Sequence, residues 1–310
     1  MARKDFGKGK KGEKDRKLPL FFLCTGLFTA FFFLPVSPAR AHTTYTFAVY
    51  PTNDPAKVHA AFRPLADFVA AETGWTLRVV VTRNYEEMEQ RLQDGSVDFA
   101  MVSPAAYVRF VSHVCYVATY AEWSETLQVF SPYYHAVVIA LKEGSVATLQ
   151  ELEGKNFGFT DRESTSGHRV PRRMLLQEGI EPEKFFKNVF YLGRHDAVIE
   201  SLLAGSIQGG AVSDGTLHTA ISQYGDLFRV LALSDPIPLD PVVASPGVPE
   251  EDAALLREVL LSLPPDSSAM EGIREILGWP GAGFVLLNTN FYDSLREALE
   301  PEIPQEDQER

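Results

Sequence analysis

The sequence predicts an α/β protein of two lobes joined by a two-strand hinge, with a ligand cleft between the lobes. Two stretches in which short strands alternate with helices follow one another along the chain. Their strands are apolar and rich in β-branched residues, which suits parallel sheets covered on both faces. The last part, residues 249–300, reads mainly as helix without a strand set of its own, so it must pack on a lobe already formed.

The first stretch lies before residue 134. We expect strands at 46–50, 76–81, 97–102 and 115–120, with helices at 55–73, 85–94 and 104–111. Gly74 and Gly95 follow the first two helices, where a left-handed residue ends a helix. We expect this first lobe to span residues 42–133.

The second stretch begins with a longer strand. We expect strands at 134–141, 156–160, 189–192, 209–212 and 228–233, with helices at 148–152, 166–178, 197–204 and 216–224. The strands at 134–141 and 228–233 are the predicted hinge. The second lobe with its hinge strands then spans 134–233, and residues 234–310 return to the first lobe.

Residues 1–41 have the pattern of an export signal. A basic segment runs to Lys17, a 17-residue apolar segment follows from Leu18 to Leu34, and residues 39–41 form an A-x-A cleavage site. We expect cleavage after Ala41 and a periplasmic product. An uncleaved anchor is the alternative, because 17 residues lie at the lower limit for spanning a bilayer.

Charge and cysteine content exclude several classes of protein. Residues 1–41 hold nine of the 29 Lys and Arg and three of the 41 Asp and Glu, so the rest has a formal net charge of −18. So acidic a surface argues against nucleic acid or anionic lipid as a partner. Cleavage would remove Cys24 and leave Cys115, so no intramolecular disulfide is expected. We expect Cys115 to be a buried strand residue.

Loops that follow the predicted strands carry many hydrogen-bond donors. In such a two-lobed protein these loops face the cleft. Hydroxyl groups, tyrosines and a histidine dominate them, and such a set suits a tetrahedral oxyanion. The loops are residues 82–85, 103–107, 131–135, 164–167, 193–196 and 213–216.

Ser164-Thr165-Ser166-Gly167 has two interpretations. A helix that starts there leaves its first backbone N–H groups unpaired and carries a partial positive charge, so the segment could hold a phosphate-like group. A serine or threonine at this place could equally cap the helix. His195 is similarly open to a structural role, and Tyr85 and Tyr134 taken singly also fit core packing.

Motifs of catalysis and metal binding are absent from the sequence. There is no G-x-S-x-G, G-x-x-x-x-G-K-[ST], H-E-x-x-H or C-x-x-C, and the histidines show no tight ligand spacing. We therefore expect no enzymatic activity, no metal and no cofactor.

Taken together, the loops resemble a known family. S-T-S-G-x-x-x-P at residues 164–171, G-x-H-D-A at 193–197, N-Y-x-x-M at 84–88, V-D-F-A-x-x-S-P-x-A-Y at 97–107 and Y-H-x-V at 134–137 occur in its order. The chain thus resembles the substrate-binding proteins of phosphonate, phosphite and phosphate ABC transporters over roughly residues 46–224.

The resemblance implies a type II periplasmic-binding-protein fold that closes on a phosphonate-like group. It implies a monomeric binding protein without catalytic activity, whose partner is a permease in the inner membrane. The alternative is a sensory module for a membrane histidine kinase. The implied ligand-binding residues are Tyr85, Ser103, Tyr107, Tyr134, Ser164, Thr165, Ser166, His195 and Asp214.

One position departs from the aminophosphonate-binding members of this family. They carry an acid after the last strand of the second lobe to pair with the ligand amine, and Gly215 stands at the nearest place here. Asp214, one residue earlier, either substitutes for that acid or caps the next helix. Phosphite, methylphosphonate or phosphate is therefore at least as good a candidate as an aminoalkylphosphonate.

Overall fold

The structure, a computed structural model, describes residues 43–124 and 129–299. The export signal predicted for residues 1–41 lies outside this part of the chain. Within these two ranges, no helix combines the length and the hydropathy that a bilayer crossing requires.

The first sheet has seven strands and is built mainly from the beginning and the end of the chain. β1 runs parallel to β2 and β3, whereas β13 runs antiparallel between β3 and β4. In spatial order the strands are β14 (Gly281–Val285), β4 (Cys115–Ser124), β13 (Pro241–Ala244), β3 (Phe99–Met101), β1 (Thr44–Val49) and β2 (Thr76–Val81), with β5 (Val129–Ser131) paired to β4.

The second sheet has five strands. β10 pairs parallel with β8 and antiparallel with β7. In spatial order the strands are β11 (Phe228–Leu233), β7 (Ala136–Leu141), β10 (Gly209–Ser213), β8 (Asn156–Phe159) and β9 (Asn188–Tyr191). We call the first sheet with its helices the first lobe and the second sheet with its helices the second lobe.

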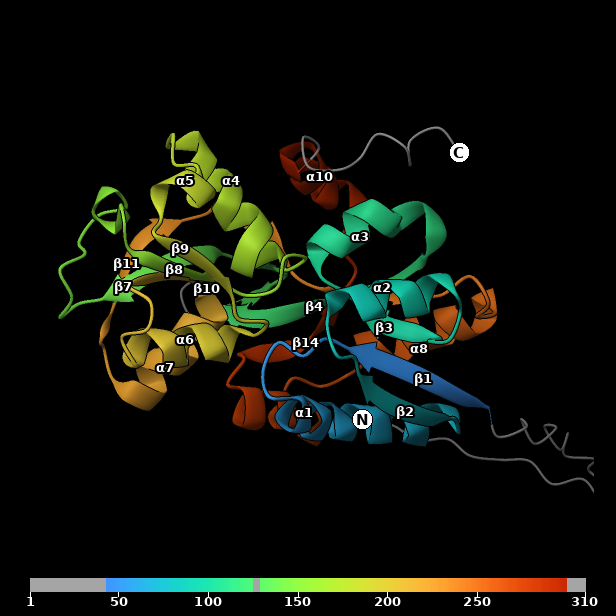
Figure 1. Ribbon diagram of the computed structural model, residues 1–310. Helices are drawn as coiled ribbons and strands as arrows, with labels where there is room; N and C mark the ends of the chain where they lie inside the picture. The colour runs from blue at the N-terminus through green and yellow to red at the C-terminus, as the bar shows by residue number, and fades with distance from the viewer. Residues whose placement is uncertain (1–42, 125–128, 300–310) are drawn as a thin grey trace, which may run out of the picture. The chain divides into compact units, whose positions relative to one another are not determined.

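Helices cover both faces of each sheet. Figure 1 shows α1 on one face of the first sheet and α2 and α3 on the other, while α4 and α5 lie opposite α6 and α7 in the second lobe. The helices are α1 (Pro55–Thr73), α2 (Tyr85–Gln93), α3 (Pro104–Phe110), α4 (Val170–Gln177), α5 (Pro182–Phe185), α6 (His195–Leu203), α7 (Asp214–Tyr224), α8 (Glu250–Leu261), α9 (Ser268–Gly272) and α10 (Asp293–Leu299). Shorter helical turns are η1 (Val111–His113), η2 (Gln150–Leu152), η3 (Thr165–Arg169), η4 (Ile273–Leu277) and η5 (Thr289–Tyr292).

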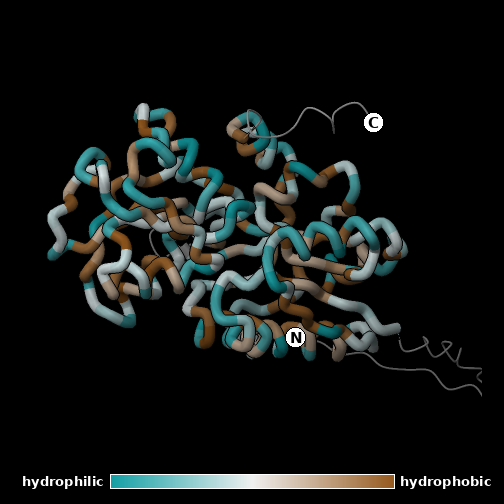
Figure 2. Tube along the Cα trace, viewed as in Figure 1, coloured by the Kyte–Doolittle hydropathy of each residue, from teal (hydrophilic) through white to brown (hydrophobic). Residues whose placement is uncertain are grey.

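Local sequence accounts for α1, the longest helix of the described residues. In α1, apolar residues at helical spacing turn one face inward, and Val58, Phe62 and Leu65 are buried against the first sheet. Figure 2 shows this alternation of hydrophobic and hydrophilic residues along α1. Asp54 caps the helix by accepting from the N–H groups of its first turn, and Gly74 ends it with φ of 75°.

The chain passes between the sheets at two short strands that pair with each other. β6 (Tyr133–Tyr134) and β12 (Ile237–Pro238) run antiparallel, with Tyr134 opposite Ile237. The strands predicted as the hinge belong largely to the second sheet as β7 and β11, and the crossings lie directly beside them. Pro132 and Pro236 directly precede β6 and β12, and proline cannot donate to a ladder, so neither strand extends further towards its N-terminus.

Two expectations were wrong. Residues 249–300 do carry a strand, since β14 lies at the edge of the first sheet, and β13, which precedes them and lies inside the same sheet, was not predicted either. β13 is only four residues long and begins with Pro241, and β14 contains two glycines, so neither has the usual strand pattern. Cys115 is exposed rather than buried, because it is the first residue of β4.

Candidate functional site

A cavity lies between the loops of both lobes, next to the β6–β12 crossing. Its volume is about 60 Å³, well below the roughly 300–1,000 Å³ of sites for drug-sized ligands, so it fits a ligand of a few heavy atoms. It is lined by Tyr50, Thr52, Tyr85, Ser103, Tyr120, Glu122, Tyr134, Ser164, Thr165, Ser166, His195, Ser213, Asp214, Gly215, Thr216, Leu239, Asp240 and Trp279.

The Ser164–Gly167 segment is both a helix cap and a wall of the cavity. The Ser164 hydroxyl oxygen accepts from the N–H of Gly167 at 3.1 Å and thereby caps η3, a single π-helical turn that continues into α4. Thr165 Oγ1 accepts from the N–H of Ala105 in the other lobe, at 2.9 Å. A hydroxyl that accepts can still donate, so Ser164, Thr165 and the buried Ser166 keep O–H groups for a ligand.

Gly167 serves packing rather than ligand approach. A Cβ on this residue would lie 1.8 Å from Thr160 Oγ1, which belongs to the loop after β8. The N–H of Thr160 also donates to the Gly167 carbonyl, at 3.1 Å. The glycine therefore lets η3 approach the end of the strand closely, and this contact fixes the height of Thr165 and Ser166 above the sheet.

Two tyrosines face the serines of this segment. Tyr85, at the start of α2, stacks on Tyr50 with ring centroids 4.2 Å apart, and its hydroxyl faces Ser164. The hydroxyl of Tyr134, in β6, faces Ser166. Burial raises the pKa of both tyrosines, so both stay neutral hydrogen-bond donors at physiological pH.

His195 is neutral, and the structure defines its tautomer. The N–H of Ser213 donates to Nδ1 at 3.2 Å, so the ring proton sits on Nε2. Burial lowers the pKa of His195 to about 4, although the charge of Asp196 opposes this shift. The ring therefore offers one N–H donor to the cavity. Its own backbone N–H donates across the lobes to the carbonyl of Thr52, at 3.1 Å.

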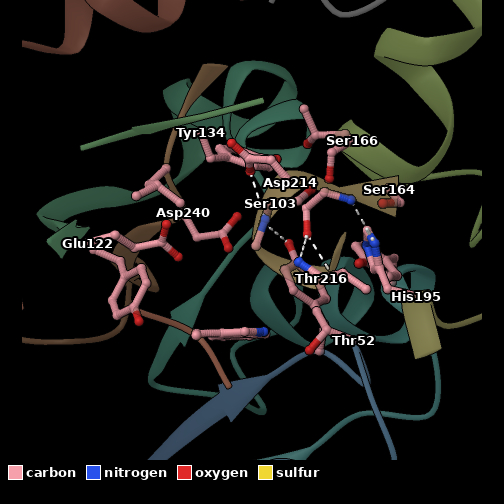
Figure 3. Close-up of a pocket in the computed structure, with 18 residues that line it drawn as sticks. Thr52, Ser103, Glu122, Tyr134, Ser164, Ser166, His195, Asp214, Thr216 and Asp240 are labelled. Carbon is pink, nitrogen blue, oxygen red and sulfur yellow. Dashed lines mark hydrogen bonds between the residues drawn. The ribbon is translucent and has the colours of Figure 1, made fainter. Parts of the chain in front are cut away.

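Three carboxylates line the cavity. Figure 3 shows Glu122 and Asp240 on the far side from Ser164, Ser166 and His195, with Asp214 nearer the centre. Burial raises the pKa of Glu122 to about 8, with further contributions from Asp214 and Asp240, and burial raises that of Asp240 to about 7. Burial also raises the pKa of Asp214.

No positive side chain balances these carboxylates. Within the described residues, the cavity lining contains neither Lys nor Arg, and the side chains of Glu122 and Asp240 have no hydrogen-bond or ion-pair partner there. Two further groups there lack protein partners, since the hydroxyl oxygens of Thr52 and Tyr120 are buried without one. Unsatisfied groups of this kind are costly unless a ligand or water completes them.

The structure brings together eight of the nine residues predicted for the site. Tyr107 is the exception, because it turns away from the cavity and packs edge-on against Tyr292 with ring centroids 4.8 Å apart. The residues at the cavity are Tyr85, Ser103, Tyr134, Ser164, Thr165, Ser166, His195 and Asp214.

Sequence reasoning missed several residues of the lining. Tyr50 and Thr52 directly follow β1, so the rule that loops after strands face the cleft could have found them. Glu122 and Asp240 gave no such signal, because Glu122 lies within β4 and Asp240 in the return crossing. In the described part of the chain, no group of three His, Cys, Asp or Glu side chains could hold a metal ion.

Comparison with known proteins identifies the family. Residues 47–288 match the family of ABC transporter, phosphonate, periplasmic substrate-binding proteins. The chain is 25% identical over 196 residues to the phosphate-import protein PhnD of Mycolicibacterium smegmatis, and this alignment covers 59% of each protein. It is 22% identical over 276 residues to the tetrathionate sensor histidine kinase TtrS of Salmonella typhimurium, covering 86% of this chain and 45% of the kinase.

The chain spans about half the length of these two relatives. Among solved structures, PhnD1 from Prochlorococcus marinus in complex with methylphosphonate has a TM-score of 0.72 and 15% identity, covering 84% of this chain and 99% of that one. That likeness shows the type II fold predicted from the sequence. Because the family match extends over most of the chain, this protein belongs to the periplasmic substrate-binding proteins of ABC phosphonate transporters, a family of solute-binding proteins.

Proposed function

We propose that the protein captures a small phosphorus oxyanion that also carries a positive charge, and that it delivers this ligand to an ABC permease. The observation that supports this most is the division of the cavity into a side of neutral donors and a side of carboxylates. An aminoalkylphosphonate has a complementary charge at each end. The rival ligands are phosphate, phosphite and simple alkylphosphonates.

The donor side suits the phosphoryl group. The hydroxyls of Thr165 and Ser166, the tyrosine hydroxyls of Tyr85 and Tyr134 and the Nε2–H of His195 line it. Each hydrogen bond to a charged oxygen contributes about 1.5–3 kcal/mol. Micromolar binding requires about −8 kcal/mol in total, so a few such bonds suffice after ordering costs.

The carboxylate side suits an ammonium group. At an effective dielectric constant of about 20, opposite charges about 6 Å apart attract by about 3 kcal/mol, and like charges repel by the same amount. A dianion without a positive group would meet that repulsion from each ionised carboxylate. It can enter only if Glu122 and Asp240 are protonated, for which their pKa values of about 8 and about 7 leave room.

Calorimetry with a matched pair of ligands tests the proposal. 2-Aminoethylphosphonate and ethylphosphonate share the head group and the chain length and differ in the ammonium group. We expect the amine to bind at least tenfold more tightly to the wild type. Asp240→Asn should reduce that preference while leaving ethylphosphonate binding unchanged or tighter. Asp266→Asn, which removes an exposed carboxylate outside the cavity, is the matched control and should change neither ligand.

Two outcomes would count against the proposal in different ways. If ethylphosphonate or phosphate binds as tightly as the amine, the positive charge is not recognised, but capture of a phosphorus oxyanion stands. If no phosphorus oxyanion binds while sulfate or a sulfonate does, the assignment of the oxyanion itself fails.

A sensory role is the second candidate, and the similarity to a sensor histidine kinase over 86% of this chain favours it. The same cavity would then report ligand to a kinase instead of loading a permease. Ligand-dependent stimulation of ATP hydrolysis by a reconstituted permease supports transport. Stimulation of kinase autophosphorylation in its place supports sensing.

A further inference from the structure

We propose that Arg109 and Glu163 form a latch that holds the two lobes closed and thereby sets ligand affinity without touching the ligand. Arg109 lies on α3 of the first lobe and Glu163 in the loop after β8 of the second lobe. The guanidinium of Arg109 donates to the carboxylate of Glu163 across the cleft. We call this pair the Arg109–Glu163 latch.

Each partner of the latch is held in place by a second ion pair within its own lobe. Arg109 also donates to Glu89 of α2, and Glu163 also accepts from Arg169 of η3, at 2.5 Å. The charges thus alternate along the series Glu89, Arg109, Glu163, Arg169. Because the inner two side chains are oriented by the outer two, less rotamer entropy is lost when the lobes meet.

The network is shielded enough from water to be strong. The side chains of Glu89, Arg109 and Arg169 are 15%, 15% and 12% exposed, and that of Glu163 is 26% exposed. Burial raises the pKa of Glu163, but its two arginines lower it more, and the net pKa lies below the ordinary value. Separating the lobes would leave Arg109 and Glu163 with one partner each instead of two, and breaking such a shielded pair is more costly than breaking a surface pair.

The latch lies outside the ligand site. None of its four residues lines the cavity. By contrast, the cross-lobe hydrogen bonds from Ala105 to Thr165 and from His195 to Thr52 involve residues of the cavity wall. A ligand enclosed by residues of both lobes makes all of its contacts only when the lobes are closed. Its apparent affinity is therefore proportional to the fraction of the free protein that is closed.

Small-angle X-ray scattering combined with calorimetry tests the inference. The variants are Arg109→Met and Glu163→Gln; each removes the cross-lobe pair from one side, so a folding defect in one leaves the other informative. Lys142→Met is the matched control, because it breaks the ion pair with Asp226, and both partners belong to the second lobe. The ligand used is 2-aminoethylphosphonate.

We expect the free wild type and the free Lys142→Met protein to have the same radius of gyration, which saturating ligand lowers only slightly because the latch already favours the closed form. The free latch variants should have a larger radius of gyration that saturating ligand restores to the wild-type value. Their dissociation constants should rise about tenfold, between the effects of exposed and buried ion pairs.

Free variants that scatter like the wild type would overturn the latch. The inference rests on the proposed function only for the affinity arm. Scattering of the ligand-free proteins tests the latch even if 2-aminoethylphosphonate does not bind. A failure of 2-aminoethylphosphonate to bind would count against the proposed function alone.

Discussion

Replacing Glu122 by glutamine should stabilise the ligand-free protein at neutral pH while weakening its binding of a positively charged ligand. Glu122 lies on β4, faces the cavity and has no ion-pair partner in the described part of the chain. A carboxyl in this position is explained better by a ligand than by folding, because buried charges without partners oppose folding.

The size of the expected gain in stability follows from the pKa of Glu122. Burial and the neighbouring acids raise the pKa of Glu122 from 4.5 to about 8. At pH 7 the folded protein holds this carboxyl protonated, whereas the unfolded chain ionises it. Each factor of ten in proton concentration is worth 1.36 kcal/mol, so the upper limit of the penalty at pH 7 is about 3 kcal/mol. Water in the cavity reduces it, and we expect about 1–2 kcal/mol.

The sign of the pH dependence separates this effect from a change in packing. Because the folded pKa is raised, the stability associated with protonated Glu122 is fully present below pH 4.5 and is lost as the pH rises towards 8. Glu122→Gln should therefore gain nothing relative to the wild type at pH 4.5 and most at pH 8. Urea unfolding followed by circular dichroism at both pH values measures the difference. Equal effects at the two pH values would refute the reasoning.

Three further predictions concern the same cavity. Thr165→Ala and Tyr134→Phe should each weaken ligand binding by roughly 1–3 kcal/mol in calorimetry with an unchanged circular dichroism spectrum, and unchanged affinity in both would contradict the site. Between pH 6 and 8, affinity for 2-aminoethylphosphonate should rise as Glu122 and Asp240 ionise, whereas affinity for phosphate should fall after correction for its own ionisation; a common direction would contradict the division of the cavity. Gly167→Ala should lower the free energy of unfolding by about 1–3 kcal/mol through its clash with Thr160, while Gly247→Ala, whose Cβ meets nothing within 4 Å, should have little effect.

Much of the fold could be predicted because its signals are local. α1 and β2 have their predicted bounds, since an N-terminal proline, a cap and Gly74 mark the helix and a β-branched run marks the strand. β13 and β14 were missed because their strand character comes from pairing with β4, a segment more than a hundred residues away. No propensity within four or five residues records such a partner.

The residues of the site also divide into those with a local sequence signal and those brought together only by the fold. The donors of the second lobe were predictable, because Ser164, Thr165, Ser166 and His195 stand where a strand ends and a helix begins. Ser103 and Tyr107 belong to one motif, yet only Ser103, the N-cap residue of α3, lines the cavity, whereas Tyr107 lies within α3 and packs against Tyr292. The carboxylates of Glu122 and Asp240 meet only because β4, β13 and the return crossing are neighbours in the folded protein.

A ligand that completes the unsatisfied groups and the contacts between the lobes both stabilise the closed form. Glu122 and Asp240 and the unpartnered hydroxyls of Thr52 and Tyr120 oppose folding of the empty cavity. A ligand with both charges would satisfy these groups when the lobes are closed and lose most of its contacts when they open. Its binding energy therefore falls almost entirely on the closed form, which is the condition for a ligand to shift a conformational equilibrium. The Arg109–Glu163 latch adds to the same form from outside the cavity, so affinity and closure can be adjusted independently of ligand recognition.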